Sequence, residues 1–100
     1  LDRTIFITGA SSGIGLATAK KFSQNGDKLI LLARREDKLK ALQYELESPV
    51  HYICADVSDL TSLKSGLSSL PEEFSNVDVL INNAGITLGE GVQWTPLVRQ

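Results

Sequence analysis

Apolar residues gather along the chain in short runs with little polar alternation, at residues 3–8, 28–33, 50–56 and 77–82. The second run, KLILLA, is the most continuous. Strands of a parallel sheet that helices cover on both faces have this pattern, because neither face meets water. The chain is therefore expected to form four strands.

The segments between these runs space their apolar residues as helices do, at residues 14–25, 36–47 and 58–70. In the first segment Ile14, Ala17 and Phe22 follow this spacing, with Leu16 and Ala19 adding to it, and in the other two segments leucines recur on one face. Ser58 or Asp59 is the expected N-cap of the last segment. Three helices are therefore expected between the strands.

Strands that alternate with helices indicate parallel strands joined by right-handed crossovers, so the expected fold class is α/β. We predict a Rossmann-like, partial doubly wound parallel sheet with four strands and three helices. The chain starts at Leu1, contains no methionine and enters its first strand at once, which favours a piece of a longer protein. Residues 1–100 would form the N-terminal part of one domain, truncated before its second half, with residues 86–100 as irregular loop.

Composition narrows the possible partners. The net charge of −2 and the pI near 5.3 give no general attraction for nucleic acid or for an anionic membrane. The longest apolar run, residues 29–33, is far shorter than the roughly 20 residues of a membrane span. We expect a soluble cytoplasmic protein with neither a nucleic acid nor a membrane as its partner.

The chain contains a single cysteine and a single histidine. Cys54 lies in an apolar stretch, and free cysteine often packs as a small hydrophobe, so we expect it to be a buried strand residue. A zinc site has no support, because His51 and Cys54 have no further histidine or cysteine to join them. No metal site is predicted.

A glycine-rich loop, TGASSGIG, joins the first strand to the first helix. Gly9 allows a sharp turn, and the helix that follows presents unpaired backbone amides and the positive end of its dipole. A pyrophosphate would satisfy both, whereas the Gly-Lys-Ser/Thr of a phosphate loop is absent. The alternative is a turn that only lets the helix pack closely on the sheet. The predicted pyrophosphate-binding residues are Gly9, Ser11, Ser12, Gly13, Ile14 and Gly15.

Two arginines follow the second strand. An NAD site usually places an acidic residue there to bond the ribose 2′-hydroxyl, whereas an arginine accommodates a 2′-phosphate. Here Ala33 ends the strand and Arg34 and Arg35 come next, at a helix N-terminus that disfavours cations unless an anion joins them. The pattern predicts NADP rather than NAD. The alternative is a solvated charge cluster balanced by Glu36 and Asp37.

Polar residues also follow the third and fourth strands. The Asp56 carboxylate can accept a hydrogen bond from the adenine amine, with Val57 beside it, or it can cap the next helix. After the fourth strand, Asn82 and Asn83 can tie strands together or face the cofactor ribose. The small residues Ala84 and Gly85 would let a ring or sugar approach the main chain, and a plain turn is the alternative.

Together these motifs resemble the short-chain dehydrogenase/reductase family. Residues 8–15 match its T-G-x-x-x-G-x-G, Asp56 its adenine-side aspartate and residues 82–85 its N-N-A-G, in the family's order. Residues 33–35 are similar to the NADP-preferring subset, and residues 86–89 to members that oxidise serine and related 3-hydroxy acids. The resemblance implies strand order 3-2-1-4 and hydride transfer between NADP(H) and a small alcohol or carbonyl compound.

The resemblance also implies a catalytic serine and a Y-x-x-x-K pair. Ser48 stands four positions after Tyr44, and Asp56 stands four after Tyr52, so neither tyrosine fits this pair. No catalytic residue is assigned in this chain. We expect the residues that act on the substrate to lie beyond Gln100.

Three functions are compatible with these residues. The chain is the cofactor-binding part of an NADP-dependent oxidoreductase, a stand-alone NADP-binding or regulatory module, or a structural remnant that binds nothing. The implied strand order also leaves the apolar fourth strand as an open edge, which invites pairing with another chain. We therefore expect a homo-oligomer or self-association through this edge, which contains Val77, Val79, Leu80 and Ile81.

Overall fold

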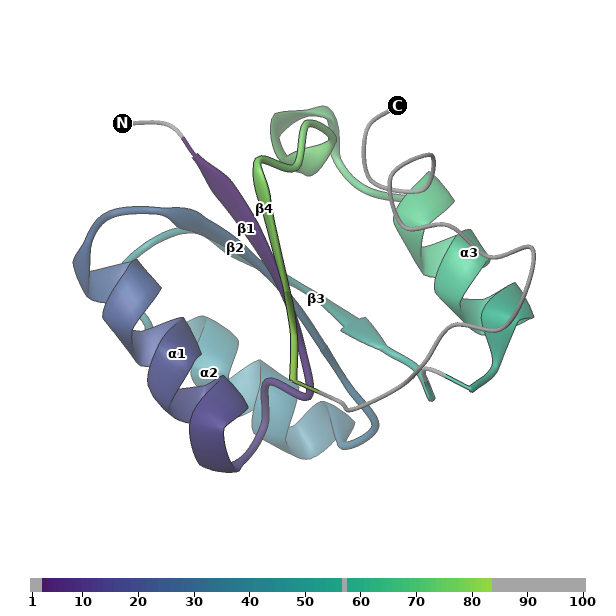
Figure 1. Ribbon diagram of the computed structural model, residues 1–100, viewed down its shortest axis with the longest axis horizontal. Coiled ribbons are helices and arrows are strands. Elements are labelled where there is room, and N and C mark those ends of the chain that lie inside the picture. Colours follow the sequence, from purple (N-terminus) through teal and green to yellow (C-terminus); the bar gives the residue numbers. More distant parts are fainter. Residues whose placement is uncertain (1–2, 57, 84–100) are drawn as a thin grey trace.

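The computed structural model describes residues 3–56 and 58–83 (Figure 1). Strands and helices alternate along this part of the chain, as the hydrophobic pattern predicts. The strands are β1 (Thr4–Thr8), β2 (Lys28–Ala33), β3 (Val50–Cys54) and β4 (Val79–Asn82). The helices are α1 (Gly13–Gln24), α2 (Glu36–Glu45) and α3 (Leu60–Ser68), and a short 3-10 helix, η1 (Glu72–Phe74), precedes β4.

The strands form one parallel sheet in the order β3-β2-β1-β4. Phe6 of β1 pairs with Ile30 of β2 on one side and with Leu80 of β4 on the other. From β1 the chain therefore runs outward through β2 and β3, then returns to the opposite side of β1. This arrangement confirms the predicted α/β sheet and its strand order, and places the reversal of strand order between β1 and β4.

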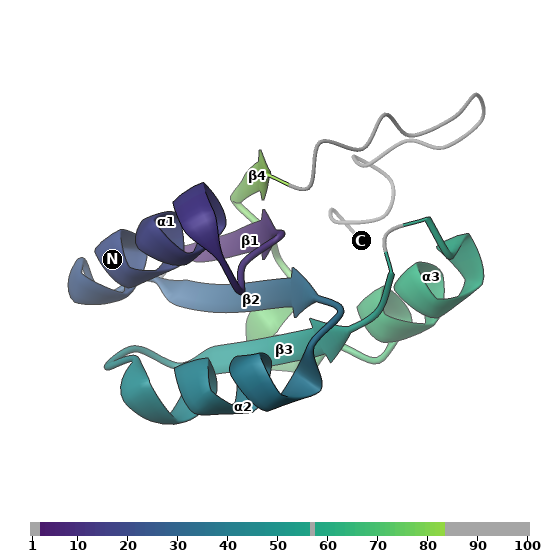
Figure 2. The same cartoon turned by 90° about the horizontal axis from the view of Figure 1, so that it is seen from below.

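Helices cover both faces of the sheet, α1 and α2 on one face and α3 with η1 on the other (Figures 1 and 2). Successive strand residues point to opposite faces, so each strand contributes to two cores. The core beneath α1 and α2 includes Ile5, Ile7, Leu29, Leu31, Leu39 and Leu42. The core beneath α3 and η1 includes Phe6, Ile30, Leu32, Ile53, Leu63 and Phe74.

The connection between α3 and β4 is not a plain loop. It contains η1, and Phe74 at the end of η1 is only 4% exposed. The strand that follows starts at Val79 rather than at Val77, because the Asp78 carboxylate accepts a hydrogen bond from the Thr4 amide at 2.9 Å. A side chain thus takes the place of a backbone partner at this end of the sheet.

Helix α1 packs through only part of the apolar face that its spacing suggests, because Leu16, Ala19 and Phe22 join the core beneath it and the other two residues do not. Ile14 and Ala17 are exposed, Ile14 by 76%, whereas Gly15, Ala19 and Ser23 are buried. A Cβ atom on Gly15 would lie 1.9 Å from the Gly9 carbonyl oxygen. The glycine thus brings the helix against the loop backbone, and this close approach determines which face of α1 turns inward.

The prediction that Cys54 is buried is wrong. Cys54 is exposed, because it ends β3, the outer strand on that side of the described sheet, where β2 is the strand's partner. Its thiol donates a hydrogen bond to the Arg34 carbonyl oxygen at 3.4 Å.

Charged side chains are paired at the amino ends of the strands. Arg3 makes a two-pronged contact with the buried carboxylate of Asp27, from Nε at 3.1 Å and from Nη2 at 3.0 Å. Asn25 donates a further hydrogen bond to Asp27 at 3.3 Å. Such forked pairs fix geometry as well as contributing energy, so this cluster ties the start of β1 to the turn before β2.

Candidate functional site

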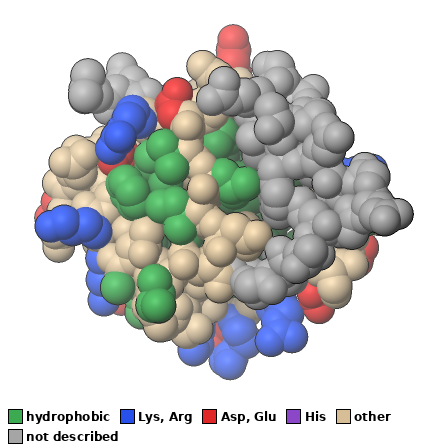
Figure 3. Space-filling model, viewed as in Figure 1, with side chains coloured by type: hydrophobic (Ala, Val, Ile, Leu, Met, Phe, Trp, Pro, Cys, Tyr) green, Lys and Arg blue, Asp and Glu red, His purple; other side chains and the backbone are tan. Residues whose placement is uncertain are grey.

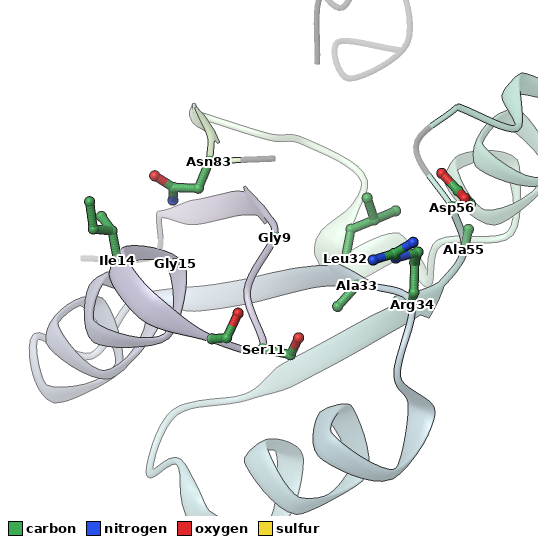
Figure 4. A pocket seen from close by; sticks show the side chains of 11 residues that line it. Gly9, Ser11, Ile14, Gly15, Leu32, Ala33, Arg34, Ala55, Asp56 and Asn83 are labelled. Carbon is green, nitrogen blue, oxygen red and sulfur yellow. The ribbon is translucent and has the colours of Figure 1, made fainter. Parts of the chain in front are cut away.

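A cavity of about 520 Å³ lies at the carboxyl ends of the strands (Figure 4). Every strand contributes to it directly or through the residue that follows, which agrees with the position of ligands in open α/β sheets. Its lining consists of Gly9, Ser11, Ser12, Ile14, Gly15, Leu32, Ala33, Arg34, Ala55, Asp56 and Asn83.

The glycine-rich loop forms one wall of the cavity. Gly9 has a φ of 62°, a conformation that favours glycine, and it turns the chain away from β1. The Ala10 amide then donates to the Leu32 carbonyl oxygen at 3.2 Å, which anchors the loop to the end of β2. The contact of Gly15 with the Gly9 backbone completes a tight loop whose main chain lies next to the open cavity.

Helix α1 begins at this loop without a side-chain cap. Ser12 is the N-cap residue, but its hydroxyl makes no capping hydrogen bond, and the first turn contains no acidic residue. By contrast, Asp59 caps α3 by accepting from the Ser62 amide at 3.2 Å. The first amides of α1 therefore lack the anionic partner that α3 supplies for itself, and the helix dipole adds positive potential there. This end of α1 suits a phosphate group.

The two arginines after β2 have different surroundings. Arg34 lines the cavity and makes no ion pair with any residue in the described part of the chain. Arg35 is not among the lining residues, and its guanidinium pairs with Asp37 at 3.2 Å on an exposed surface. Arg35 thus has the solvated acidic partner that a charge cluster would give it. Arg34 is the arginine that contributes a cation without an ion pair among the described residues to the cavity.

The Asp56 carboxylate lies beside Arg34 on the rim that β2 and β3 form (Figure 4). Its Oδ1 accepts two hydrogen bonds from Ser58, from the amide at 2.9 Å and from the hydroxyl at 2.7 Å. These bonds hold the pKa of Asp56 below its usual value, and the positive charge of Arg34 acts in the same direction. Asp56 therefore presents a carboxylate to the cavity, while Asp59 rather than Asp56 or Ser58 is the helix cap.

The two asparagines after β4 have separate surroundings. Asn82 accepts a hydrogen bond from the Thr8 hydroxyl at 2.8 Å, which joins the ends of β1 and β4. Asn83 lines the cavity, and its side-chain amide nitrogen is buried without a hydrogen-bond partner among the described residues. A buried donor without a partner costs about 1–3 kcal/mol. A ligand oxygen in the cavity would remove this cost.

The cavity brings together most of the residues predicted from the sequence. Gly13 begins α1 but is not among the lining residues, and Val57, Ala84, Gly85 and residues 86–100 lie outside the described residues. Leu32 and Ala55 line the cavity although no motif marks them. They could have been predicted by including the residue that precedes each strand-end motif, because Leu32 precedes Ala33 and Ala55 precedes Asp56. Ser58 could have been found from the Asp-x-Ser spacing, which is typical of a side-chain turn.

A protein-family model described as short chain dehydrogenase matches residues 3–96. The chain belongs to the short-chain dehydrogenase family.

Curated members of this family are similar over most of the chain. Serine 3-dehydrogenase of Rhizobium radiobacter is 46% identical over 89 residues, which are 89% of this chain and 36% of that protein. An NADP-dependent 3-hydroxy acid dehydrogenase of Schizosaccharomyces pombe is 49% identical over 92 residues, covering 87% of this chain and 36% of that protein. This short-chain dehydrogenase chain thus spans about a third of the length of the curated relatives it matches.

Solved structures of the family show the same fold. L-sorbose reductase of Gluconobacter frateurii, determined with NADPH and L-sorbose, superposes with a TM-score of 0.73 at 33% sequence identity. The match covers 91% of this chain and 36% of that one. The described sheet and helices therefore have the fold of part of a short-chain dehydrogenase, and the match spans about a third of such a chain.

Neither tyrosine of this short-chain dehydrogenase chain lines the cavity. Tyr44 is 92% exposed on α2, and the Tyr52 hydroxyl bonds the Glu36 carboxylate at 3.3 Å. Across the described ranges, no group of three or more histidine, cysteine, aspartate or glutamate residues could hold a metal ion. The helices in those ranges are also too short or too polar to cross a membrane.

Proposed function

We propose that this chain forms the NADP(H)-binding part of an oxidoreductase that transfers hydride between the cofactor and a small alcohol or carbonyl compound. The observation that carries the proposal is one cavity that contains both the uncapped N-terminus of α1 and the unpaired cation of Arg34. Phosphate groups would satisfy both features. The names of relatives that include NADP, and the NADPH in the L-sorbose reductase structure, support the same cofactor.

The lining residues fit this dinucleotide. The loop from Gly9 to Gly15 has no side chain between its backbone and the cavity at the glycine positions, and its amides and two serine hydroxyls are donors for a pyrophosphate. The buried amide of Asn83 is a donor for a ribose or carboxamide oxygen. Asp56 is an acceptor for the adenine amine. When bound, NADP(H) supplies or takes up the hydride, and the residues of this chain hold and orient it.

Arg34 would give the site its preference for NADP over NAD. A hydrogen bond to a charged group contributes about 1.5–3 kcal/mol, which corresponds to a preference of roughly tenfold to a hundredfold. Ala33 ends β2 where an NAD-binding domain usually has an acidic residue, so no carboxylate there repels a 2′-phosphate. Asp56 is the one acid among the described lining residues, and it follows β3 rather than β2.

Calorimetric titration of the 100-residue chain with NADPH and NADH tests the proposal. Wild type should bind NADPH saturably and more tightly than NADH. Arg34→Ala should lose roughly tenfold to a hundredfold in NADPH affinity, with little change for NADH. Lys64→Ala removes one exposed cation on α3, away from the cavity lining, and serves as the matched control.

The outcomes separate the three functions. Absence of saturable NADPH binding would favour a structural remnant and overturn the proposal, and equal binding of NADH would overturn the role of Arg34. A second assay uses the longest natural protein that contains this chain, mixed with NADPH and a carbonyl compound. A fall in the absorbance of NADPH would show turnover and so separate an oxidoreductase from a binding module. Binding without turnover in that protein would favour the module.

We also propose that the chain self-associates through β4. In the described sheet β1 is the one neighbour of β4, and Val79, Leu80 and Ile81 are only partly buried. Hydrophobic side chains gather on the face of the molecule over the β1 and β4 region (Figure 3). Sedimentation velocity should show concentration-dependent oligomers that Val79→Lys weakens. Val50→Lys, on the opposite edge strand β3, is the control, and a wild-type monomer at all concentrations would contradict the proposal.

A further inference from the structure

The loop between β3 and α3 contains two aspartates, each of which accepts hydrogen bonds from the amide and the hydroxyl of one serine. Asp56 accepts from the amide and hydroxyl of Ser58, and Asp59 accepts from the amide and hydroxyl of Ser62. Asp59 and Ser62 belong to the cap of α3. Asp56 neither caps a helix nor pairs with a cation in the described residues, yet it lines the cavity. Capping therefore accounts for the Asp59–Ser62 pair but not for the Asp56–Ser58 pair.

The geometry of the Asp56–Ser58 pair leaves one carboxylate oxygen unused. Both bonds from Ser58 end on Oδ1, and within residues 3–56 and 58–83 no donor reaches Oδ2. Two bonds to one oxygen fix the direction of the carboxylate, because rotation about its side-chain torsions would break at least one of them. The second oxygen is thus a preset acceptor in the lining of the cavity.

We propose that Ser58 is a positioning residue that sets the base selectivity of the cavity, by holding Asp56 so that its free oxygen accepts the exocyclic amine of adenine. This inference rests on the proposed function, since it assigns one end of the cavity to the base of the dinucleotide. A carboxylate accepts hydrogen bonds but cannot donate one. A base with a carbonyl in place of the amine would therefore meet repulsion at Asp56, and the site would select adenine over hypoxanthine.

The charge state of Asp56 agrees with this role. The Ser58 bonds and the nearby charge of Arg34 lower the pKa of the carboxyl group, so it stays ionised at neutral pH. A protonated carboxyl group could turn its O–H toward a carbonyl and would discriminate poorly. Ser58 itself is exposed and does not line the cavity, so its effect on a ligand has to pass through Asp56.

The test compares NADPH with its reduced hypoxanthine analogue, which has a carbonyl in place of the exocyclic amine and a hydrogen on the neighbouring ring nitrogen N1, by titration of the 100-residue chain. Wild type should prefer NADPH by roughly tenfold or more. Ser58→Ala removes the hydroxyl bond and keeps the amide bond, so the preference should fall by about fivefold, equivalent to one typical hydrogen bond. Ser58→Thr retains the hydroxyl and should restore the preference, which a general loss of stability would not explain.

Two further variants complete the design. Ser62→Ala removes the equivalent hydroxyl from the cap of α3 and should leave the ratio of the two affinities unchanged. Asp56→Asn should keep its side-chain oxygen on the Ser58 amide and so present its NH2 donor to the cavity, and its ratio should fall to one or below. A ratio near one in wild type, or a ratio that Ser58→Ala does not change, overturns this inference even if NADPH binds and Arg34→Ala weakens it. Failure of wild type to bind NADPH overturns the proposed function together with this inference.

Discussion

The two ends of the parallel sheet use the same kinds of residues in opposite ways. At the amino ends, Arg3 is paired with Asp27, and Asp78 bonds the Thr4 amide. At the carboxyl ends, Arg34 makes no ion pair with any described residue, and the buried amide of Asn83 has no partner there. The amino edge satisfies its own polar groups, whereas the carboxyl edge leaves donors directed at a cavity.

Whether a polar group already has an internal partner, rather than its residue type, indicates whether it contributes to stability or to ligand binding. Arg3 and Arg34 are both cations at strand ends, yet only Arg34 can gain by meeting an external anion. Breaking a pair at the amino edge leaves a polar group without its partner and should therefore affect folding. Removing an unpaired group at the carboxyl edge disrupts no internal bond and should affect ligand binding alone. Substitutions at the two edges can test this division.

The largest effect is expected from a glycine substitution at the carboxyl edge, Gly15→Ala, and a glycine at the amino edge provides the comparison. Gly15→Ala places its Cβ against the backbone of Gly9, which cannot yield as a side chain would, so we expect a loss of about 3 kcal/mol or more in unfolding free energy. Gly26→Ala, in the turn at the amino edge, meets no atom within 4 Å and carries only the strain of its φ of 90°, about 1–2 kcal/mol. Urea denaturation measures both losses.

NADPH titration of the same variants provides the second measurement. Gly26→Ala should bind as wild type does, because the turn lies at the opposite end of the sheet from the cavity. Normal stability and normal binding in Gly15→Ala would contradict the close approach of helix and loop.

The sheet was predictable because its strands carry a strong hydrophobic signal. Residues 29–33 are buried in the structure, and an unbroken apolar run of this length between helical segments is typical of a strand covered on both faces. The phase of α1 was only partly predictable in this way. Leu16, Ala19 and Phe22 pack on the core as their spacing suggests. Gly15 and Ser23 are also buried but carry little hydrophobic signal, and the close contact of Gly15 with a loop residue outweighs the apolar Ile14.

The candidate site was predictable at the level of motifs but not at the level of partners. Arg34, Asp56 and Asn83 each follow a strand, and they could be expected in one site because parallel strands end at one edge of the sheet. Whether a charged residue is already paired depends on rotamers that the sequence does not specify. Arg35 and Arg34 are therefore equivalent in the sequence pattern, and the contact of Arg35 with Asp37 is what distinguishes them.

The second-largest loss of unfolding free energy is expected from breaking a buried hydroxyl contact near the amino edge. Ser23 on α1 accepts hydrogen bonds from the Ser48 amide at 3.2 Å and from the Ser48 hydroxyl at 3.1 Å. Ser23→Ala would leave these buried donors without an acceptor, which costs about 1–3 kcal/mol. Urea denaturation should show this loss, with NADPH affinity unchanged. Ser65→Ala on the exposed face of α3 is the control, and an equal loss in both variants would contradict the contact.

The Arg3–Asp27 pair should give a pH-dependent effect. Hydrogen bonding from Arg3 lowers the pKa of Asp27 below its usual value of 3.8, so the pair stabilises the fold above that pH and loses this contribution as the pH falls through the folded-state pKa. Asp27→Asn removes this titration. Its Tm should lie below that of wild type at neutral pH, and the gap should narrow under acid conditions. A gap that is constant from neutral to acid pH would mean that the pair contributes no such linkage.

The smallest effect is expected at the exposed pair of Arg35 and Asp37, where the side chains are 64% and 67% exposed. Exposed pairs contribute little to stability, so Arg35→Ala should leave the Tm nearly unchanged.

Asp37→Asn releases Arg35 from its partner and makes a second cation available beside the cavity. NADPH affinity should therefore rise by roughly twofold to fivefold, the equivalent of one exposed ion pair, while NADH affinity stays constant. If Arg35→Ala instead weakens NADPH binding as strongly as Arg34→Ala does, the two arginines act together, and an internal ion pair does not exclude a residue from the site.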